Sequence, residues 1–153
     1  MMENKNKNAI LSKLKINQLN PMQEEASLAI YSAKDVFILS PTGSGKTLAF
    51  LLPLISLLDK NENQLQSLIL VPTRELAIQI EQVIREMGAG YKANAFYGGR
   101  AFTKDRQDLN HTPSILIGTP GRIADHIRRN TIDVSNLKSL VLDEFDKSLE
   151  IGF

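Results

Sequence analysis

The stretch SPTGSGKT, from Ser40 to Thr47, decides how the rest of the sequence is interpreted. It follows the apolar run VFILS and precedes TLAFLLPLISLL, which is a strand-then-helix context. In that context the pattern G-x-x-x-x-G-K-[ST] forms a loop that wraps phosphate groups. Ser40 replaces the first glycine of the pattern, and because serine is also small, we interpret the stretch as a phosphate-binding loop.

Each part of this loop has a chemical task. Gly43 and Gly45 permit the backbone angles that turn successive N–H groups inward, toward an anion. Lys46 supplies a cation to the outer phosphates, and Thr47 offers a hydroxyl to a magnesium ion. The residues expected to hold a nucleotide in the loop are Thr42, Gly43, Ser44, Gly45, Lys46 and Thr47.

A pair of acids completes the predicted site. In SLVLDEFD, Asp143 and Glu144 directly follow an apolar strand pattern. A magnesium-bound nucleotide needs a carboxylate near the metal, and hydrolysis needs a group that orients and deprotonates water. An isolated Asp-Glu pair is more often a turn or a helix cap, but its occurrence with Lys46 and Thr47 favours catalysis. The predicted catalytic residues are Lys46, Asp143 and Glu144.

Short aliphatic runs alternate with helical patterns along the chain, which predicts an α/β domain with a mainly parallel sheet and helices on both faces. Helices are expected to begin at Asn20-Pro21, at Thr73 and at Thr119-Pro120. The predicted strands are Val36–Leu39, Ser67–Val71, Ala93–Tyr97, Ser114–Ile117 and Ser139–Leu142. Ligands of such sheets bind at the carboxyl ends of the strands, where the unusual residues fall.

Composition narrows the class of protein. The 153 residues are most simply one domain, and the absence of cysteine excludes disulfides and thiolate metal sites, which fits a reducing, cytoplasmic setting. The longest apolar run, Leu48 to Leu58, is too short for a bilayer and predicts a buried helix, so no membrane association is expected. The net charge of +1 neither demands nor excludes a nucleic-acid partner.

Several further motifs occur in a fixed order: PMQ, SPTGSGKT, PTRELA, a Gly-Gly pair, TPGR and DEFDKSLEIGF. In this order they resemble the first RecA-like domain of a DEAD-box ATP-dependent RNA helicase. In that family the loop usually opens with alanine, so Ser40 is a small-for-small change. Phe145 stands where the family has the alanine of its name. The resemblance implies ATP and Mg²⁺ as cofactors, with Thr47 and Asp143 on the metal, partly through water.

The resemblance also implies that Gln23 reads adenine. A side-chain amide has one donor and one acceptor side, which match the N6 amino group and N7 of adenine, whereas guanine offers two acceptors on that edge. A structural role is equally compatible with the sequence, because Asn20 and Gln23 have the spacing of a capping box. Where the family has an aromatic residue about seventeen positions earlier, Asn6 stands here.

RNA is the partner that the resemblance implies, and its binding is expected to be independent of base sequence. The physical reason is that Thr73 and Thr119 begin helices, whose free N–H groups suit phosphates, and that Arg74 and Arg122 lie in those first turns. Plain caps and solvated arginines are the alternative interpretation. The residues implied in RNA binding are Pro72, Thr73, Arg74, Gly98, Gly99, Thr119, Pro120, Gly121 and Arg122. Arg100, Lys104 and Arg106 are expected to lie on a solvated helix.

By comparison with the family, residues 1–153 are expected to form an incomplete helicase ATP-binding domain. The family's next strand carries a Ser-Ala-Thr motif and lies between the loop strand and the Asp-Glu strand. A second RecA-like domain follows it and is an expected partner. A non-catalytic P-loop fragment that binds nucleotide or a protein is the alternative. A GTPase is disfavoured, since no Asn-Lys-x-Asp segment occurs.

Overall fold

A computed structural model of the chain describes residues 4–151, which group into two compact units. The first unit comprises the chain up to Leu58 together with Glu86–Ala89. The second comprises Asp59–Arg85 and the chain from Gly90 onward. The final Gly-Phe of the segment DEFDKSLEIGF lies outside the described residues.

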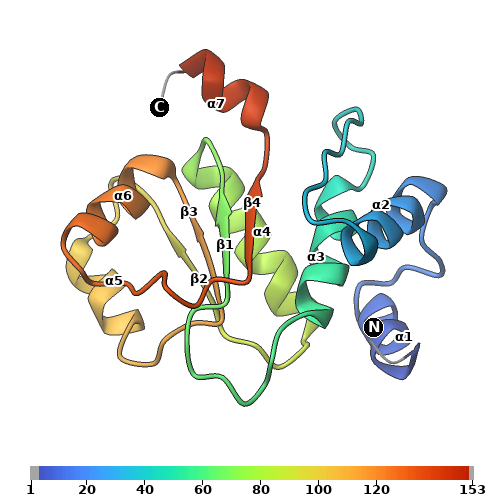
Figure 1. The fold of residues 1–153 in the computed structure, drawn as a ribbon, viewed down its shortest axis with the longest axis horizontal. Helices are drawn as coiled ribbons and strands as arrows, with labels where there is room; N and C mark the ends of the chain where they lie inside the picture. The colour runs from blue at the N-terminus through green and yellow to red at the C-terminus, as the bar shows by residue number, and fades with distance from the viewer. Residues whose placement is uncertain (1–3, 152–153) are drawn as a thin grey trace. The chain divides into compact units, whose positions relative to one another are not determined.

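The first unit contains the helices α1 (Asn4–Lys13), α2 (Pro21–Ser32) and α3 (Lys46–Ser56), shown in Figure 1. The predicted start of α2 is confirmed, because Asn20 is its N-cap and a proline opens its first turn. The predicted buried helix is confirmed in α3, whose residues 48–55 are all buried. Within residues 4–151, every helix lacks the length or the apolar character that crossing a membrane requires.

The prediction of a strand from Val36 to Leu39 is wrong. This segment has no regular secondary structure and joins no sheet within residues 4–151. Phe37 and Leu39 are 92% and 94% exposed. An apolar run becomes a strand only when a neighbouring strand pairs with its N–H and C=O groups, and none of the described strands does so. Apolar composition alone therefore does not make this segment a strand.

The second unit is built on a parallel sheet of β1 (Ser67–Leu70), β2 (Ala93–Phe96), β3 (Ile115–Gly118) and β4 (Ser139–Leu142). Their order across the sheet is β2-β3-β1-β4. These elements confirm four of the predicted strands to within a residue or so at each end. The carboxyl ends are level, because Leu70 pairs with both Gly118 and Leu142, and Phe96 pairs with Gly118.

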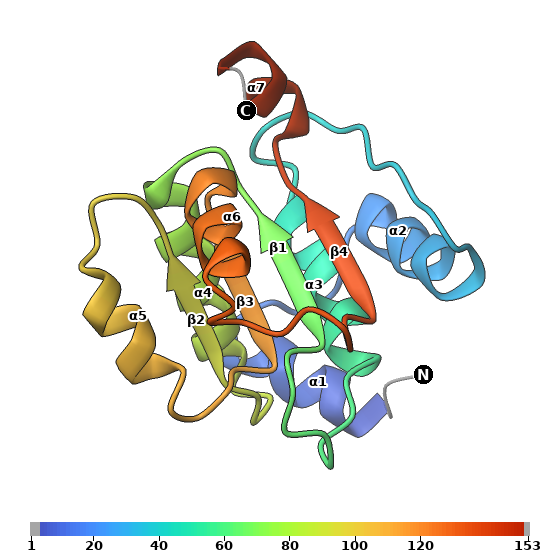
Figure 2. The same ribbon diagram turned by 60° about the vertical axis from the view of Figure 1, so that its left-hand side comes forward.

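The remaining helices of the second unit are α4 (Arg74–Met87), α5 (Phe102–Asp108), α6 (Pro120–Arg128) and α7 (Phe145–Ile151). Figure 2 shows α4 and α6 on opposite faces of the sheet. On the α6 face, Ile123 packs in one buried cluster with Leu68, Phe96 and Leu116. Side chains alternate between the faces of a strand, so this cluster accounts for only half of the sheet's apolar residues. The predicted α/β fold is confirmed.

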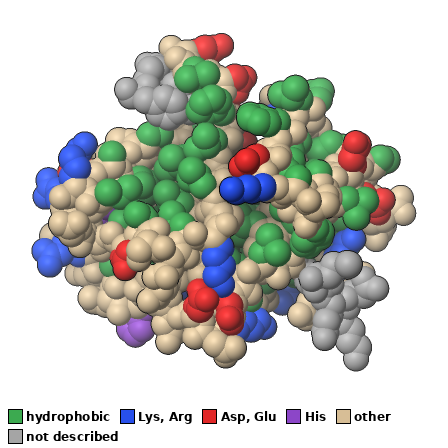
Figure 3. Space-filling view, viewed as in Figure 1, with side chains coloured by type: hydrophobic (Ala, Val, Ile, Leu, Met, Phe, Trp, Pro, Cys, Tyr) green, Lys and Arg blue, Asp and Glu red, His purple; other side chains and the backbone are tan. Residues whose placement is uncertain are grey.

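The two edges of this sheet differ in how far they are covered. At the β2 edge, Glu81 of α4 accepts a hydrogen bond from the backbone N–H of Ala95 at 2.7 Å, so part of that edge is covered. At the β4 edge, Leu140 and Leu142 are 58% and 44% exposed. Hydrophobic side chains are also uncovered on α7, at the top of Figure 3. The β4 side of the unit is therefore an open apolar edge among the described residues.

The end of β3 generates a stability prediction. A Cβ atom at Gly118 would lie 2.4 Å from the Ile123 side chain and 2.9 Å from the Phe96 carbonyl oxygen. We expect Gly118→Ala to lower the free energy of unfolding by about 1–3 kcal/mol, measured by urea denaturation. Gly98→Ala is the matched control, since a Cβ there meets nothing within 4 Å. Equal stability of the two variants would contradict the close packing at Gly118.

Candidate functional site

The loop from Ser40 to Thr47 has the backbone of a phosphate-binding turn. Gly43 and Gly45 have φ values of +81° and +88°, which side chains rarely tolerate. The backbone N–H of Ser44 donates to the Pro41 carbonyl at 3.3 Å. The hydroxyls of Ser40 and Ser44 are hydrogen-bonded at 2.5 Å, so the serine at the loop's first position closes the loop.

Gln23 and Asn20 brace this loop from α2. The Gln23 amide accepts from the Asn20 backbone N–H at 2.9 Å, and Asn20 accepts in return from the Gln23 backbone at 2.9 Å, which completes a capping box. The Gln23 Nε2 donates to the Gly45 carbonyl at 3.2 Å, and the Asn20 Nδ2 donates to the Ser44 carbonyl at 3.1 Å. The capping interpretation of Gln23 is thus confirmed.

This brace also requires glycine at position 45. A Cβ atom there would lie 2.4 Å from the Gln23 Nε2. The close approach lets the buried amide of Gln23, which is 7% exposed, hold the loop where α3 begins. A single glutamine therefore couples the start of α2 to the start of α3.

Lys46 and Thr47 are the first residues of α3 and are half-buried. Neither side chain makes a hydrogen bond or ion pair with another described residue, so both can respond to a ligand. The first N–H groups of a helix lack intrahelical partners and carry its positive dipole end. The start of α3 thus offers backbone donors, one ammonium and one hydroxyl to an anion.

Asp143 and Glu144 follow β4 in the second unit. The backbone N–H of Asp143 donates to the Leu70 carbonyl at 3.0 Å, which continues the β1–β4 ladder by one residue. The Asp143 Oδ1 accepts from the Glu144 backbone N–H at 3.0 Å. Glu144 has a φ of +51°, which is uncommon for a residue with a side chain and tends to occur at functional positions. Lys147 lies 3.3 Å from the Glu144 carboxylate.

The start of α4 carries Thr73, Arg74 and Glu75. The Thr73 hydroxyl accepts from the Leu76 backbone N–H at 3.3 Å, so the predicted cap is confirmed. Arg74 is exposed and pairs with Glu75 at 3.1 Å. The pKa of the Glu75 carboxyl lies below its ordinary value. The main cause is a hydrogen bond from its own backbone N–H, and the second is the hydrogen bond from Arg74. Pro72, half-buried, connects this start to β1.

The other residues expected to meet RNA follow β2 and β3. Gly98 and Gly99 form an exposed turn with open space around both. Thr119 is the N-cap residue of α6, as predicted, but its hydroxyl accepts no capping bond. Pro120 opens the first turn of α6, and Gly121 is exposed there. Unlike Thr73, Thr119 is therefore not a conventional side-chain cap.

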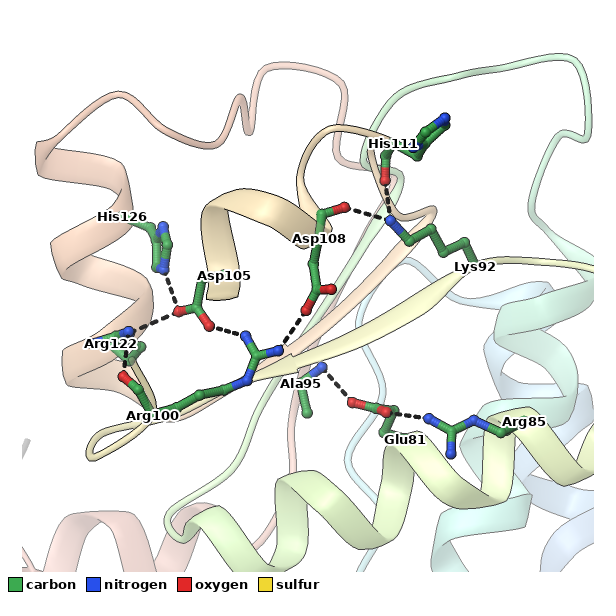
Figure 4. A network of polar contacts seen from close by, with 10 residues as sticks. All are labelled: Glu81, Arg85, Lys92, Ala95, Arg100, Asp105, Asp108, His111, Arg122 and His126. Carbon is green, nitrogen blue, oxygen red and sulfur yellow. Dashed lines mark hydrogen bonds and ion pairs between the residues drawn. The ribbon is translucent and has the colours of Figure 1, made fainter. Parts of the chain in front are cut away.

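Arg122 belongs to a partly buried network of charged side chains that the sequence did not reveal (Figure 4). Its Nε donates to Asp105 at 2.9 Å and its Nη2 donates to the Arg100 carbonyl at 2.8 Å. Arg100 itself pairs with Asp105 and with Asp108. His126 contacts the same Asp105 carboxylate at 2.8 Å. The alternative of a solvated Arg122 is wrong, and so is the prediction that Arg100 lies on a solvated helix.

Burial and the neighbouring carboxylates act in opposite directions on the charged form of Arg100. Partial burial acts to lower the pKa of its guanidinium, but hydrogen bonds to Asp108 and Asp105 outweigh burial and raise that pKa. The signal for this network is weak in sequence, because Asp105 finds partners that are 5, 17 and 21 residues away along the chain. Only the folded sheet unit brings these side chains together.

A phosphate loop that opens a helix, together with a parallel sheet covered on both faces, defines a RecA-like P-loop domain. A family model described as DEAD/DEAH box helicase matches residues 20–153. The chain belongs to this family.

Individual relatives agree with the family match. The chain is 40% identical over 146 residues to the ATP-dependent RNA helicase DeaD of Escherichia coli K12, covering 94% of this chain and 23% of that protein. It is 42% identical over 134 residues to the ATP-dependent RNA helicase DbpA of Bacillus subtilis, covering 86% and 28%. The chain therefore spans about a quarter of the length of these curated relatives.

A solved structure confirms the fold. The crystal structure of a hypothetical ATP-dependent RNA helicase from Sulfolobus tokodaii matches with a TM-score of 0.87 and 28% identity. The match covers 99% of this chain and 44% of that chain.

The contacts of Asn20 and Gln23 with the loop can be tested by mutation. We expect Asn20→Ala to lower the free energy of unfolding by about 1 kcal/mol, because the Gln23 backbone N–H loses its capping acceptor. Asn20→Asp keeps that acceptor and loses only the donor to Ser44, so it should remain closer to wild type. Urea denaturation of both variants measures the difference, and identical midpoints would show that the cap contributes nothing.

Proposed function

We propose that this chain is the ATP- and RNA-binding lobe of an ATP-dependent RNA helicase. The observation that carries the proposal is the phosphate loop at the start of α3, braced by Gln23, within a chain that the helicase family model matches from residue 20 onward. The relatives named above are ATP-dependent RNA helicases of greater length, so unwinding or remodelling of RNA belongs to the full-length protein.

ATP binding is assigned to the loop residues Thr42 to Thr47. The α3 N-terminus and Lys46 neutralise the phosphates, since both present donors to an anion. Thr47 and Asp143 supply oxygen donors of the kind that Mg²⁺ prefers, partly through water. When bound, Mg²⁺ would neutralise charge on the phosphate oxygens. Glu144 would orient the attacking water and accept its proton.

Gln23 retains the capacity to read adenine after bracing the loop. Its amide uses one acceptor position on Asn20 and one N–H on Gly45. A side-chain amide has a second N–H and a second oxygen lone pair, so a donor and an acceptor remain for a base edge. Structural and recognition roles are therefore compatible in one side chain, and ATP should be preferred over GTP.

RNA binding is assigned to the turns that follow β1, β2 and β3. The first turns of α4 and α6 offer backbone donors and positive dipole ends to phosphates, and the exposed turn at Gly98 and Gly99 permits close approach of a backbone. Contacts of this kind reach phosphates and sugars, so they carry no base code. We therefore propose sequence-independent binding, with 2′-hydroxyls available to distinguish RNA from DNA.

Turnover requires more than this lobe. In NTPases an arginine that stabilises charge on the transferred phosphoryl group accelerates hydrolysis by roughly 10³-fold or more. We assign that arginine, and the other half of the RNA groove, to a second RecA-like domain of the full-length protein. The lobe alone should then bind its ligands with little RNA-stimulated ATP hydrolysis. A cytoplasmic location, inferred from the absence of cysteine, is part of the same proposal.

Nucleotide binding is tested at Lys46. We expect Lys46→Ala to weaken ATP binding at least about tenfold in calorimetry, because it removes a charged hydrogen-bond donor to the phosphates. Lys34→Ala removes an exposed lysine of the same unit and should leave the affinity unchanged. Unchanged binding by Lys46→Ala would exclude the loop as the site. Binding of GTP as tight as that of ATP would remove the adenine role of Gln23.

RNA binding is tested by its salt dependence. Each phosphate of a single strand that the protein neutralises contributes about −0.7 to the slope of log affinity against log salt concentration. We expect Arg74→Ala to weaken binding of a single-stranded RNA and to make this slope less negative by about 0.7, measured by fluorescence anisotropy. Arg85→Ala, at the other end of α4, is the matched control. A slope that both variants leave unchanged would exclude Arg74 as a phosphate ligand.

A further inference from the structure

Asp105 of α5 is a fully buried carboxylate at the centre of the network in Figure 4. Its Oδ2 accepts from Arg122 at 2.9 Å and lies 2.8 Å from the His126 Nε2, while its Oδ1 accepts from Arg100. A buried carboxylate is strongly destabilising unless charged partners and hydrogen bonds surround it. All of these partners come from the segments that follow β2 and β3.

The network joins two surfaces that the proposed function assigns to RNA. Arg100 directly follows the Gly98-Gly99 turn, and Arg122 lies in the first turn of α6. Arg122 donates to the Arg100 carbonyl at 2.8 Å as well as to Asp105. Arg122 and Asp105 thus add side-chain contacts between the glycine turn and the start of α6 to the backbone hydrogen bond from Thr119 to Phe96.

Aromatic packing fixes the same arrangement. The His126 ring stacks between Phe96 and Phe102, with centroids 4.9 and 4.4 Å away. The Arg122 guanidinium lies 4.9 Å from the centroid of Phe102. Planar groups stacked in this way leave Arg122 little freedom to swing toward solvent.

The charges within the network are balanced by the network itself. Arg100 and Arg122 face Asp105 and Asp108, so two positive groups meet two negative groups. The Arg122 side chain is 13% exposed, whereas that of Arg74 is 61% exposed. Arg122 is therefore poorly suited to act as a free counter-ion for phosphate, and well suited to tie two backbone segments together.

We propose that Asp105 is a positioning residue for RNA binding, which acts through Arg122 to hold the Gly98–Arg100 turn against the first turn of α6. This inference rests on the proposed RNA-binding function. Arg122 then holds two segments of the RNA surface together. Backbone donors and exposed cations such as Arg74 attract the phosphates.

The test depends on whether Asp105→Asn raises or lowers the affinity for RNA. Asp105→Asn removes a negative charge close to a surface that binds a polyanion, so electrostatics alone would strengthen RNA binding. Positioning predicts the opposite: the asparagine amide cannot accept from all three partners, and affinity for a single-stranded RNA should fall about tenfold. Asp125→Asn is the control for charge, because this α6 carboxylate pairs with Arg129 and Arg128 and makes no hydrogen bond to Arg100 or Arg122 among the described residues. Its affinity should be unchanged or higher.

Arg122→Lys supplies an independent measurement. Lysine keeps the positive charge, but it cannot donate to Asp105 and to the Arg100 carbonyl in the geometry of a guanidinium. We expect Arg122→Lys to lose as much RNA affinity as Arg122→Ala, with the salt slope of wild type in both. ATP affinity, measured on the same samples, should remain that of wild type, which separates a displaced RNA surface from general unfolding.

The outcomes are distinct. Wild-type RNA affinity in Asp105→Asn or in Arg122→Lys would overturn the positioning role while leaving the proposed function intact. Parallel loss of ATP and RNA affinity in Arg122→Lys would reduce the network to a requirement for folding and would also overturn the inference. If the wild-type chain binds no RNA at all, the proposed function fails first, and this inference fails with it.

Discussion

The arrangement of the second unit depends on the level register of its parallel strands. Since Leu70 pairs with both Gly118 and Leu142, the three strands end at the same height. The ladder continues one residue further, where Asp143 donates to the Leu70 carbonyl and Thr119 donates to the Phe96 carbonyl. Segments that are far apart in sequence therefore emerge along one edge, and a slip of one residue would turn their side chains to the other face.

In the first unit, side-chain hydrogen bonds instead of a sheet fix the conformation of the candidate loop. A glycine-rich loop has few internal contacts that fix its shape, and here Gln23 and Asn20 supply them from the start of α2. The same two residues close the capping box of that helix. Helix initiation and loop geometry are consequently coupled, and a change that loosens the cap also loosens the loop.

Features of this structure that depend on residues adjacent in sequence were predictable. Features that depend on contacts between distant segments were not. The starts of α2, α4 and α6 were predicted because a capping residue and its helix are adjacent in sequence. The segment from Val36 to Leu39 was misassigned because its structure depends on a partner strand, which its own residues do not reveal. The environment of Arg100 escapes prediction although its carboxylates lie only five and eight residues further along the chain, because helical periodicity does not show that the turn before α5 folds the guanidinium back onto that helix. Within the candidate site, the loop is predictable from its motif, whereas the contacts of Asp105 join residues from separate segments and form only in the folded chain.

The open apolar edge of β4 also bears on how the chain behaves in solution. Its net charge of +1 provides little mutual repulsion between molecules. Leu140, Leu142, Phe37 and Leu39 meanwhile present uncovered hydrocarbon surface, and β4 presents backbone groups that another strand can pair with. Both features favour self-association of the isolated chain at high protein concentration.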